Sequence, residues 1–369
     1  MLPDLAIIGT RGYPSYYGGF ETAVRKLAPF LADRGWRVTV YGRRDSVQFD
    51  DPARDSRVEL RLTGGIETKS LSTLSYGFTS TMHAAIRGHD VVLVMNVANG
   101  FWMPLLGARG IPTLVNVDGI EWDRAKWGRL AKWVFRWGAR ATARFGTQMV
   151  YDSQEIASRW KRDFDRDGIF IPYGGDVVGD LPIEGGLHHR RYVLMVARFV
   201  PENTFDAFLD AVPTLAETCD VVIVGSSGYG GPLDERVRDL ARIERRVHWL
   251  GHISDDQRLL SLWQHAGVYF HGHSVGGTNP ALVQAMACGA PILARDTVYN
   301  REVLGTAGRF TAPDALSIAA TVKAMLADVA LQEHLSRESR ARVAKEYTWD
   351  SVCGRYETSL LELVASRRR

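Results

Sequence analysis

The sequence has few cysteines, little net charge and no recognisable leader segment. Its three cysteines, Cys219, Cys288 and Cys353, are far apart and match neither a Cys-x-x-Cys pair nor a zinc-ligand spacing. The net charge of +3 is too small to indicate a nucleic-acid partner. The opening segment, MLPDLAIIGT, lacks the basic and apolar regions of a signal peptide. We therefore expect a protein of the reducing cytoplasm that binds no nucleic acid.

The sequence also lacks a continuous apolar segment long enough to cross a membrane. The longest uncharged stretch, residues 91–108, is interrupted by Asn96, Asn99, Gly100 and Pro104. It predicts a buried strand, a loop and a short helix. With 369 residues, 46% of them apolar and 24% charged, the chain has the composition of a folded globular protein of two or three domains.

Short aliphatic runs alternate with segments of helical spacing. After the first run, apolar residues at Phe20, Val24, Leu27 and Leu31 predict a helix that ends near Gly35. Continuous apolar runs are typical of parallel strands buried on both faces of a sheet. The runs expected as strands are Leu5–Ile8, Val38–Tyr41, Val91–Met95, Thr113–Val117, Tyr192–Val196, Val221–Val224, Val268–Phe270 and Pro291–Ala294.

The alternation of strands and helices occurs twice, on either side of a break rich in glycine and proline at residues 171–190. The sequence therefore predicts an α/β chain with two Rossmann-like, doubly wound domains, residues 1–175 and 176–348, that face a cleft. Ligands bind such sheets beyond the carboxyl ends of the strands. The loops at those ends are the candidate functional regions.

A glycine-rich loop follows the first expected strand. Gly9 and Gly12 end that strand, and Gly18 and Gly19 open the next helix. Glycines let backbone N–H groups approach a ligand closely, and a helix amino terminus favours phosphate. The spacing is not G-x-G-x-x-G, so a nicotinamide cofactor is not favoured. A strand-to-helix turn without a ligand is the alternative.

Several segments resemble the retaining glycosyltransferases of family 4, which have the GT-B fold. The amino-terminal half carries Gly-Gly-Phe-Glu-Thr at residues 18–22 and Leu-Ala-Asp-Arg-Gly-Trp-Arg-Val-Thr-Val at residues 31–40. The carboxyl-terminal half carries a strand-to-helix turn at residues 196–203 and a donor-binding segment that runs from residues 273–280 into residues 284–291. The resemblance implies transfer of a sugar from a nucleotide-sugar. It also implies that a carboxyl-terminal helix within residues 349–369 crosses back to the first domain.

Further motifs resemble a bacterial subgroup associated with rhamnosyl transfer in surface-polysaccharide biosynthesis. They are Gly-Thr-Arg-Gly at residues 9–12, Asp-Gly-Ile-Glu-Trp at residues 118–122, Lys-Trp at residues 126–127 and Gly-Gly-Thr-Asn-Pro at residues 276–280. The subgroup implies a dTDP- or UDP-linked donor, with dTDP-rhamnose favoured. It implies a saccharide or lipid-linked saccharide as acceptor.

The departing diphosphate of such a donor needs fixed positive charge. Arg198, just after an expected strand, is the candidate phosphate ligand, and a surface salt bridge is its alternative role. Asn203 stands where the family has a lysine, so one cation is missing. Arg11, in the first domain, is expected to supply the compensating charge. Gly18 and Gly19 of the same domain are expected to contact the donor through their backbone N–H groups.

Gly276, Gly277, Thr278 and Asn279 precede an expected helix that begins near residue 281, and their N–H groups are candidates to hold the donor. A simple helix cap is the alternative. The family pattern Glu-x7-Glu is replaced here by Gly276 and Gln284. We expect the Gln284 amide to bond a ribose hydroxyl.

Two carboxylates follow the strand at Thr113–Val117. Asp118 and Glu121 are the candidate catalytic residues on the acceptor side, because a strand-end carboxylate can orient a hydroxyl or accept its proton. Asp118 could equally cap a helix.

The segment from Arg124 to Arg144 is strongly basic. Its basic residues are Arg124, Lys126, Arg129, Lys132, Arg136, Arg140 and Arg144. Trp133 and Trp137 lie at the border of an apolar face, as in a helix that lies on a membrane surface. The alternative is a solvated helix whose apolar stripe, through Leu130, Val134, Trp137 and Ala141, packs inside the domain.

The sequence thus predicts a metal-independent GT-B glycosyltransferase with no cofactor beyond its nucleotide-sugar, located in the cytoplasm or at the inner face of the cell membrane. Two alternatives remain: a sugar-nucleotide 2-epimerase, which needs no acceptor, and a non-catalytic sugar-nucleotide-binding subunit. A nicotinamide dehydrogenase is disfavoured by the missing glycine fingerprint.

Overall fold

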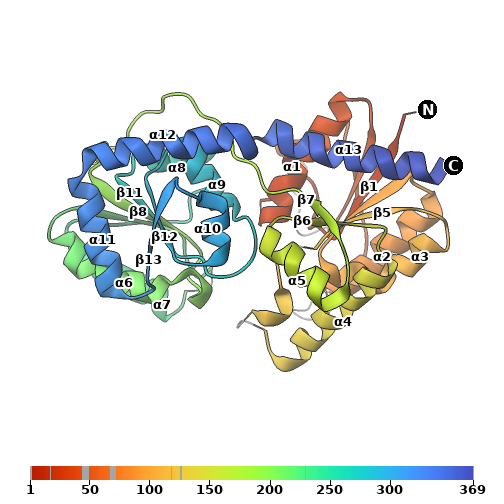
Figure 1. Cartoon of the computed structure of the whole chain (residues 1–369), viewed down its shortest axis with the longest axis horizontal. Coiled ribbons are helices and arrows are strands. Elements are labelled where there is room, and N and C mark those ends of the chain that lie inside the picture. The colour runs from red at the N-terminus through yellow and green to blue at the C-terminus, as the bar shows by residue number, and fades with distance from the viewer. Residues whose placement is uncertain are drawn as a thin grey trace. The chain divides into compact units, whose positions relative to one another are not determined.

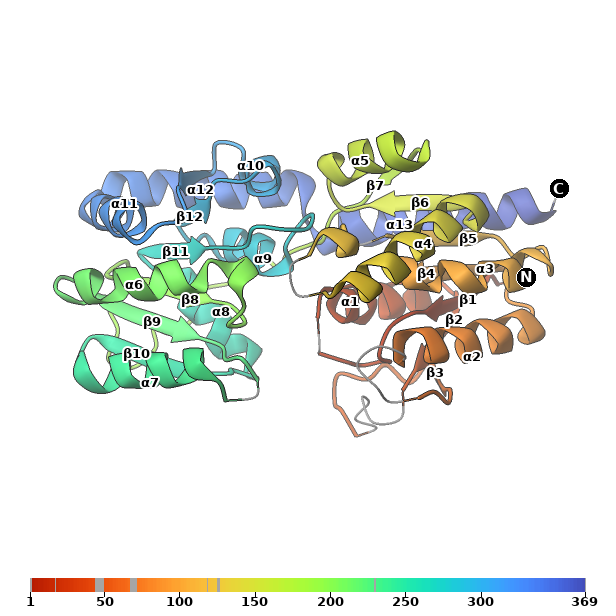
Figure 2. The ribbon, with the colours of Figure 1, turned by 90° about the horizontal axis from the view of Figure 1, so that it is seen from below.

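A computed structural model of the chain describes residues 2–16, 18–43, 50–66, 72–117, 119–124, 127–228 and 230–368. The chain forms two compact units (Figure 1). Unit 1 comprises Met1–Tyr173 and Trp349–Arg369, and unit 2 comprises Gly174–Thr348. Each unit contains one parallel sheet with helices on both faces (Figure 2), which confirms the predicted α/β class with two doubly wound domains.

Unit 1 has a seven-stranded sheet in the order β3-β2-β1-β4-β5-β6-β7. Its strands are β1 (Asp4–Ile8), β2 (Arg37–Gly42), β3 (Glu59–Leu62), β4 (Val91–Met95), β5 (Thr113–Asn116), β6 (Gln148–Tyr151) and β7 (Gly168–Phe170). Its α-helices are α1 (Gly19–Asp33), α2 (Ser72–Arg87), α3 (Met103–Gly107), α4 (Arg129–Phe145), α5 (Gln154–Phe164) and α13 (Trp349–Arg368). Two short 3-10 helices are η2 (Val97–Trp102) and η3 (Glu121–Asp123).

Helix α13 completes the core of unit 1. Its buried residues, which include Tyr356 and Leu360, pack in the same cluster as Leu27 of α1. The phenol of Tyr356 accepts a hydrogen bond from Asn116 Nδ2 at 2.7 Å. Glu357 accepts one from the Trp36 indole at 3.2 Å. The carboxyl-terminal segment is therefore an integral part of unit 1.

Unit 2 has a six-stranded sheet in the order β10-β9-β8-β11-β12-β13. Its strands are β8 (Tyr192–Val196), β9 (Asp220–Val224), β10 (Val247–Gly251), β11 (Val268–His271), β12 (Ile292–Arg295) and β13 (Gly308–Thr311). Its helices are η4 (Pro201–Asn203), α6 (Phe205–Ala216), α7 (Pro232–Ile243), α8 (Asp256–His265), α9 (Pro280–Cys288), α10 (Val298–Leu304), α11 (Ala315–Ala327) and α12 (Val329–Glu346). One buried cluster joins the sheet to α8 and α9, and another joins it to α6 and α11.

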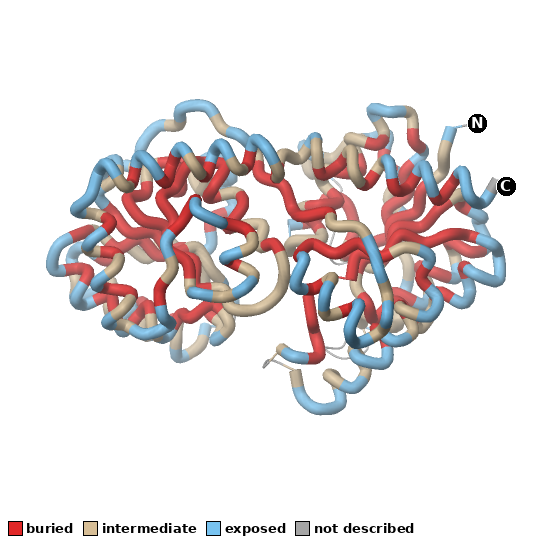
Figure 3. The backbone as a smooth tube through the Cα atoms, in the orientation of Figure 1, coloured by how far each residue is buried: buried red, intermediate tan, exposed pale blue. Residues whose placement is uncertain are grey.

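Every run expected as a strand forms one, because these runs lie at the buried centre of each unit (Figure 3). Strands β3, β6, β7, β10 and β13 were not predicted. Four of them are edge strands, and alternating exposure in β3 removes the continuous apolar run on which the prediction relied. Residues 91–108 form β4, η2 and α3, so the predicted strand and short helix are confirmed, and the segment predicted as a loop is a 3-10 helix.

The three cysteines are free and buried. In the part of the chain that the structure describes, no group of three or more His, Cys, Asp or Glu side chains could hold a metal ion. Within the same residues no single helix is long and apolar enough to cross a membrane; α11 and α12 pass that test only as a pair bent by 97°.

Candidate functional site

Arg198 follows the carboxyl end of β8 and has an exposed side chain that pairs with no carboxylate among the described residues. Asn203 fixes the loop that carries Arg198. The Asn203 Nδ2 group donates to the Arg198 carbonyl at 2.8 Å, and Asn203 Oδ1 accepts from His273 Nδ1 at 2.6 Å. Asn203 therefore does not replace the charge of the family's lysine. It joins the loop after β8 to the loop after β11.

The two loops also contact each other through their backbones. The Ser274 N–H and hydroxyl both donate to the Glu202 carbonyl at 2.9 Å. A side chain at Gly272 would begin 2.1 Å from the Asn203 carbonyl oxygen, so only glycine fits there. Strands β8 and β11 are neighbours in the sheet. Arg198 and the segment after His273 thus project from one rigid edge of unit 2.

The segment Gly276–Asn279 leads into α9. Asn279 is the N-cap, and its Oδ1 accepts from the Ala281 N–H at 2.9 Å. This is the capping role weighed as an alternative for Asn279. Gly276 has a φ of 91°, and the N–H groups of Gly276 and Gly277 have no hydrogen-bond partner within the described residues. Thr278 is buried beside them. These two N–H groups shortly precede the amino terminus of α9, the end of a helix at which an anion is stabilised.

Gln284 has a different partner from the one expected. Its Oε1 accepts from the Asp176 N–H and its Nε2 donates to the Asp176 carbonyl, each at 2.9 Å. Gln264 clamps the same linker in the same way, with Oε1 on the Leu181 N–H and Nε2 on the Gly179 carbonyl, each at 2.8 Å. The Gln284 amide therefore ties Asp176 of the linker to α9 and uses one hydrogen bond at each of its polar atoms to do so.

His271, at the carboxyl end of β11, was not singled out from the sequence. Its ring is fully buried, Nδ1 shares a hydrogen bond with Tyr269 Oη at 3.1 Å, and Nε2 has no partner among the residues described. Burial, together with the charge of His273, lowers the pKa of His271 to about 3. The ring is neutral at physiological pH. A polar residue at the end of an otherwise apolar strand was the available signal.

In unit 1 the glycine loop after β1 is tightly built. Gly9 has a φ of 88°, and a side chain there would begin 2.0 Å from the Met95 carbonyl oxygen. Gly18 is the N-cap of α1 and Gly19 is its first residue. Arg11 donates its backbone N–H to the buried carboxylate of Glu21 at 3.2 Å. Glu21, which sequence reasoning did not select, thus closes the loop that presents Arg11.

Of the two candidate carboxylates on the acceptor side, the structure describes only Glu121. Asp118 lies outside the described residues, as does Lys126. Glu121 is buried, and its Oε1 pairs with Arg124 Nε at 2.7 Å. Its Oε2 accepts from the Trp127 indole at 2.7 Å. Both oxygens of Glu121 hold neighbouring side chains, so the geometry gives this residue an anchoring role in the loop after β5.

Helix α4 contains no acidic residue and exposes a row of arginines, which are Arg129, Arg136, Arg140 and Arg144. It buries only Gly138, Ala139 and Thr142. The alternative in which the apolar stripe packs inside the domain holds only in part: Val134 and Ala141 are half-buried, but Leu130 is 77% exposed and Trp137 44%. Trp133 is 60% exposed. Small residues provide the packed side instead, because α4 lies close against η2, where a side chain at Gly138 would begin 2.9 Å from the Val97 carbonyl oxygen.

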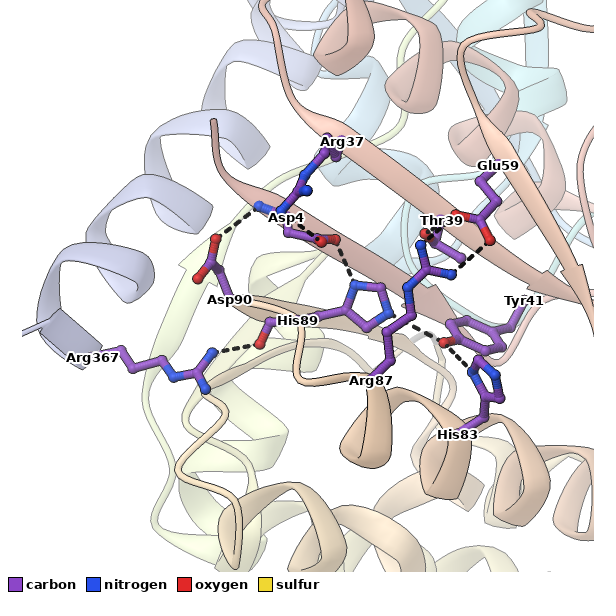
Figure 4. A network of polar contacts seen from close by, with 10 residues as sticks. All are labelled: Asp4, Arg37, Thr39, Tyr41, Glu59, His83, Arg87, His89, Asp90 and Arg367. Carbon is purple, nitrogen blue, oxygen red and sulfur yellow. Dashed lines mark hydrogen bonds and ion pairs between the residues drawn. The ribbon is translucent and has the colours of Figure 1, made fainter. Parts of the chain in front are cut away.

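A second polar cluster in unit 1 lies around the start of β1 (Figure 4). The buried His89 ring bonds the Asp4 carboxylate through Nδ1 at 2.6 Å. Tyr41 Oη bonds His89 Nε2 at 3.2 Å and His83 Nδ1 at 2.9 Å. Burial raises the pKa of Tyr41 to about 12, so the phenol stays protonated. The cluster links Asp4 at the start of β1 and Tyr41 near the end of β2 to His83 of α2 and to His89, which follows α2.

Comparison with protein-family models gives a match in each half of the chain. Residues 18–174 match the model described as a glycosyl transferase 4-like domain. Residues 190–328 match the model described as glycosyl transferases group 1. The two matches fall in unit 1 and unit 2, and the second includes the loops that carry Arg198 and Gly276–Asn279.

Two curated proteins are similar to parts of the chain. Phosphatidyl-myo-inositol mannosyltransferase of Mycobacterium leprae is 28% identical over 219 residues, which are 55% of this chain and 57% of that protein. O-antigen chain mannosyltransferase B of Escherichia coli is 27% identical over 165 residues, which are 43% of each. The chain spans about half the length of these relatives.

Solved structures share the fold over nearly the whole chain. Sucrose-phosphate synthase from Thermosynechococcus elongatus has a TM-score of 0.82 at 20% identity and covers 99% of this chain and 100% of its own. Anabaena HepE in complex with UDP and glucose has a TM-score of 0.75 at 16% identity, with 98% and 99% covered. At these identities the likeness shows the GT-B arrangement of secondary structure alone.

Proposed function

We propose that this chain, whose two halves match a glycosyl transferase 4-like domain and the glycosyl transferases of group 1, transfers a hexose from a nucleotide-sugar to a saccharide or lipid-linked saccharide during polysaccharide biosynthesis. One observation carries the proposal. Arg198 and the N–H groups of Gly276 and Gly277 project from neighbouring loops at the carboxyl edge of one sheet, and none of these groups has a partner among the described residues. This is the combination that a diphosphate requires.

The chemistry follows from charge development. When the bond between the sugar and the diphosphate breaks, the electron pair leaves with the diphosphate, and the growing negative charge faces Arg198 and the helix end. The acceptor hydroxyl attacks the sugar and loses its proton. Since both oxygens of Glu121 are occupied, we assign that proton to a donor phosphate oxygen, as in a retaining reaction without a metal. Asp118 remains the candidate to orient the hydroxyl.

We propose a dTDP- or UDP-linked donor, with dTDP-rhamnose first. The support is the subgroup motif and the residues that replace the Glu-x7-Glu pair, Gly276 and Gln284. Competition calorimetry of dTDP against UDP tests this choice directly. Clear preference for UDP would replace rhamnose with a UDP-hexose.

The activity itself is tested by product analysis. The purified protein is incubated with dTDP-rhamnose, or with UDP-hexoses, in the presence and absence of a polysaccharide precursor extract. We expect nucleotide release that depends on the extract, together with a labelled glycan. Conversion of the sugar without acceptor would establish the 2-epimerase. Tight binding without turnover would establish a non-catalytic subunit.

We further propose that α4 holds the protein at the inner, cytoplasmic face of the cell membrane. Leu130, Trp133 and Trp137 present exposed apolar area beside the row of arginines. A helix with this composition lies in the interface of an anionic membrane, with rings at headgroup level and arginines on phosphates. A lipid-linked acceptor would be found at that surface.

A further inference from the structure

A pocket of about 340 Å³ lies in unit 2 at the amino end of β8. Residues 189–191, which directly precede β8, line one wall, and α11 and α12 contribute the other. Arg198 follows the opposite, carboxyl end of the same strand. The pocket is therefore separate from the loops proposed to hold the donor. Its volume is at the lower end of the range for small-molecule sites, roughly 300–1,000 Å³.

Three of the eight described residues that line the pocket are arginines. Arg191 and Arg337 are exposed, and neither pairs with a carboxylate in the described parts of the chain. His189 also lines the pocket, and Glu333 is the one carboxylate among the described lining residues. Arg191 and Arg337, together with Arg190, make three arginines against one glutamate, so the charge of the pocket lining is positive. A positive concave surface raises the local concentration of anions.

Arg190 is held by neutral groups and not by a counter-charge. Its guanidinium donates to the carbonyls of Ala266 at 2.6 Å and Gly289 at 3.0 Å, and to Ser336 Oγ at 3.2 Å. Ala266 and Gly289 are the C-caps of α8 and α9, so the negative ends of two helices orient the group. These contacts use three of its five N–H donors.

The environment of Arg190 carries a cost. Its φ of 62° lies in the left-handed region, which few residues other than glycine adopt. Burial, with the charge of nearby Arg340, lowers the pKa of Arg190 to about 10, whereas Tyr192 and Glu333 act in the opposite direction, and the group stays protonated at neutral pH. The fold therefore keeps a strained cation at the pocket wall that forms no ion pair among the described residues, although Glu333 attracts it from a longer distance. An anionic ligand would supply the missing charge.

We propose that this pocket binds the phosphate group of a small phosphorylated molecule, with Arg190, Arg191 and Arg337 as the phosphate ligands. A guanidinium matches phosphate oxygens in pairs, and a phosphate dianion can engage several arginines at once. Leu326 and Val329 provide an apolar wall for the carbon skeleton of the ligand. The Glu333 carboxylate can accept hydrogen bonds from its hydroxyl groups. The proposal does not depend on the transferase reaction.

The test is calorimetric titration of the whole protein, at low salt, with inorganic phosphate and with glucose 6-phosphate as probes. Wild type should bind at least one probe saturably with one site per chain. The double variant Arg191→Glu/Arg337→Glu should weaken binding at least tenfold, as expected for lost charge-assisted hydrogen bonds. Both side chains are exposed and unpaired, so the fold should persist. Tighter binding of the sugar phosphate would identify the ligand as an organic ester, and equal binding would identify it as free phosphate.

Two matched variants keep the result interpretable. Arg245→Glu makes the same charge change at an exposed position of unit 2 outside the pocket, and Arg198→Ala disables the proposed donor site. Neither should alter probe binding. Equal weakening by Arg245→Glu would reduce the effect to net charge and overturn the proposal. Loss of binding in Arg198→Ala would also overturn the proposal, because it would assign the probe to the donor loops. Absence of saturable binding in wild type would overturn it as well.

Discussion

At the residue scale, a substitution of Arg198 is the most direct test of the proposed donor site. Removing its guanidinium should lower kcat/KM for the donor by about 10–100-fold, because a charge-assisted hydrogen bond to phosphate contributes roughly 1.5–3 kcal/mol. Steady-state kinetics of Arg198→Ala measure this, with Arg245→Ala as the control for an exposed arginine elsewhere in unit 2. A variant with wild-type kcat/KM would remove Arg198 from the site.

Gln284 offers a sharper question, because its amide bonds the Asp176 backbone in both directions. Replacing Nε2 with a carboxylate oxygen would set two acceptors against each other. Gln284→Glu should therefore destabilise the protein by about 1–3 kcal/mol at pH 8. The loss should shrink as the pH falls towards 5, because facing a carbonyl raises the carboxyl pKa and the protonated form can donate again. Chemical unfolding at the two pH values measures it.

Gln264→Glu is the matched control, since Gln264 makes the same pair of bonds to Leu181 and Gly179. Equal destabilisation by both variants with no change in the preference between dTDP and UDP would make Gln284 purely structural. If only Gln284→Glu shifts the preference towards UDP, position 284 contributes to nucleotide selection through α9, and the ribose contact expected from the sequence would regain support.

At the element scale, α4 predicts binding to anionic vesicles. Each basic residue near such a surface contributes about 1 kcal/mol, so Arg136→Glu/Arg140→Glu, which also adds repulsion, should weaken vesicle binding by at least 30-fold at low salt. Co-sedimentation with vesicles that contain phosphatidylglycerol measures it. Arg242→Glu/Arg245→Glu in unit 2 is the control for net charge. If the wild-type protein does not bind these vesicles, α4 is a solvated helix without a membrane role.

The elements also show how far the sequence could be read. Strands such as β4, with every residue buried, were predicted to the residue, because burial on both faces leaves a continuous apolar run. Strand β3, with the sequence ELRL, has half-exposed and exposed positions and gave no such run. Helix α4 was placed correctly, but its packed side was not. Contact through Gly138 and Thr142 depends on close approach to η2, which periodicity cannot reveal.

In the candidate site, too, the positions of residues could be predicted from the sequence better than their contacts. Positions after strand ends, such as Arg198, could be predicted because parallel topology decides where they lie. The partners of polar side chains could not. Asn203 bonds the His273 ring, Gln284 bonds the Asp176 backbone, and Glu21 closes a loop that begins at β1. Such bonds depend on how distant segments meet.

At the scale of the whole molecule, the proposed reaction requires no metal ion. Arg198 and the N–H groups of Gly276 and Gly277 are the proposed charge stabilisers. Turnover should therefore persist in excess EDTA, with less than about a twofold change, well under 1 kcal/mol on the barrier. Complete loss on chelation, restored by Mg²⁺ or Mn²⁺, would assign that role to a cation.

Whole-molecule stability should fall in mild acid because of one buried ring. The unfolded chain protonates His271 near pH 6.5, whereas the folded chain keeps it neutral down to a pH of about 3. Between these values the unfolded state binds the extra proton. A depressed histidine pKa thus contributes stability above pH 6.5 that is lost as the pH falls, by up to roughly 1.4 kcal/mol per pH unit.

Asparagine can keep the hydrogen bond to Tyr269 without titrating, so His271→Asn should flatten this dependence. We expect the thermal midpoint of wild type to drop more steeply between pH 7.5 and 5 than that of the variant. His188→Asn, at an exposed position of the same unit, should leave the slope unchanged. Since the comparison is of slopes, a uniformly less stable variant still answers the question. Parallel curves for wild type and His271→Asn would show that His271 takes up a proton without unfolding, and that the orphaned Nε2 finds a partner in solution.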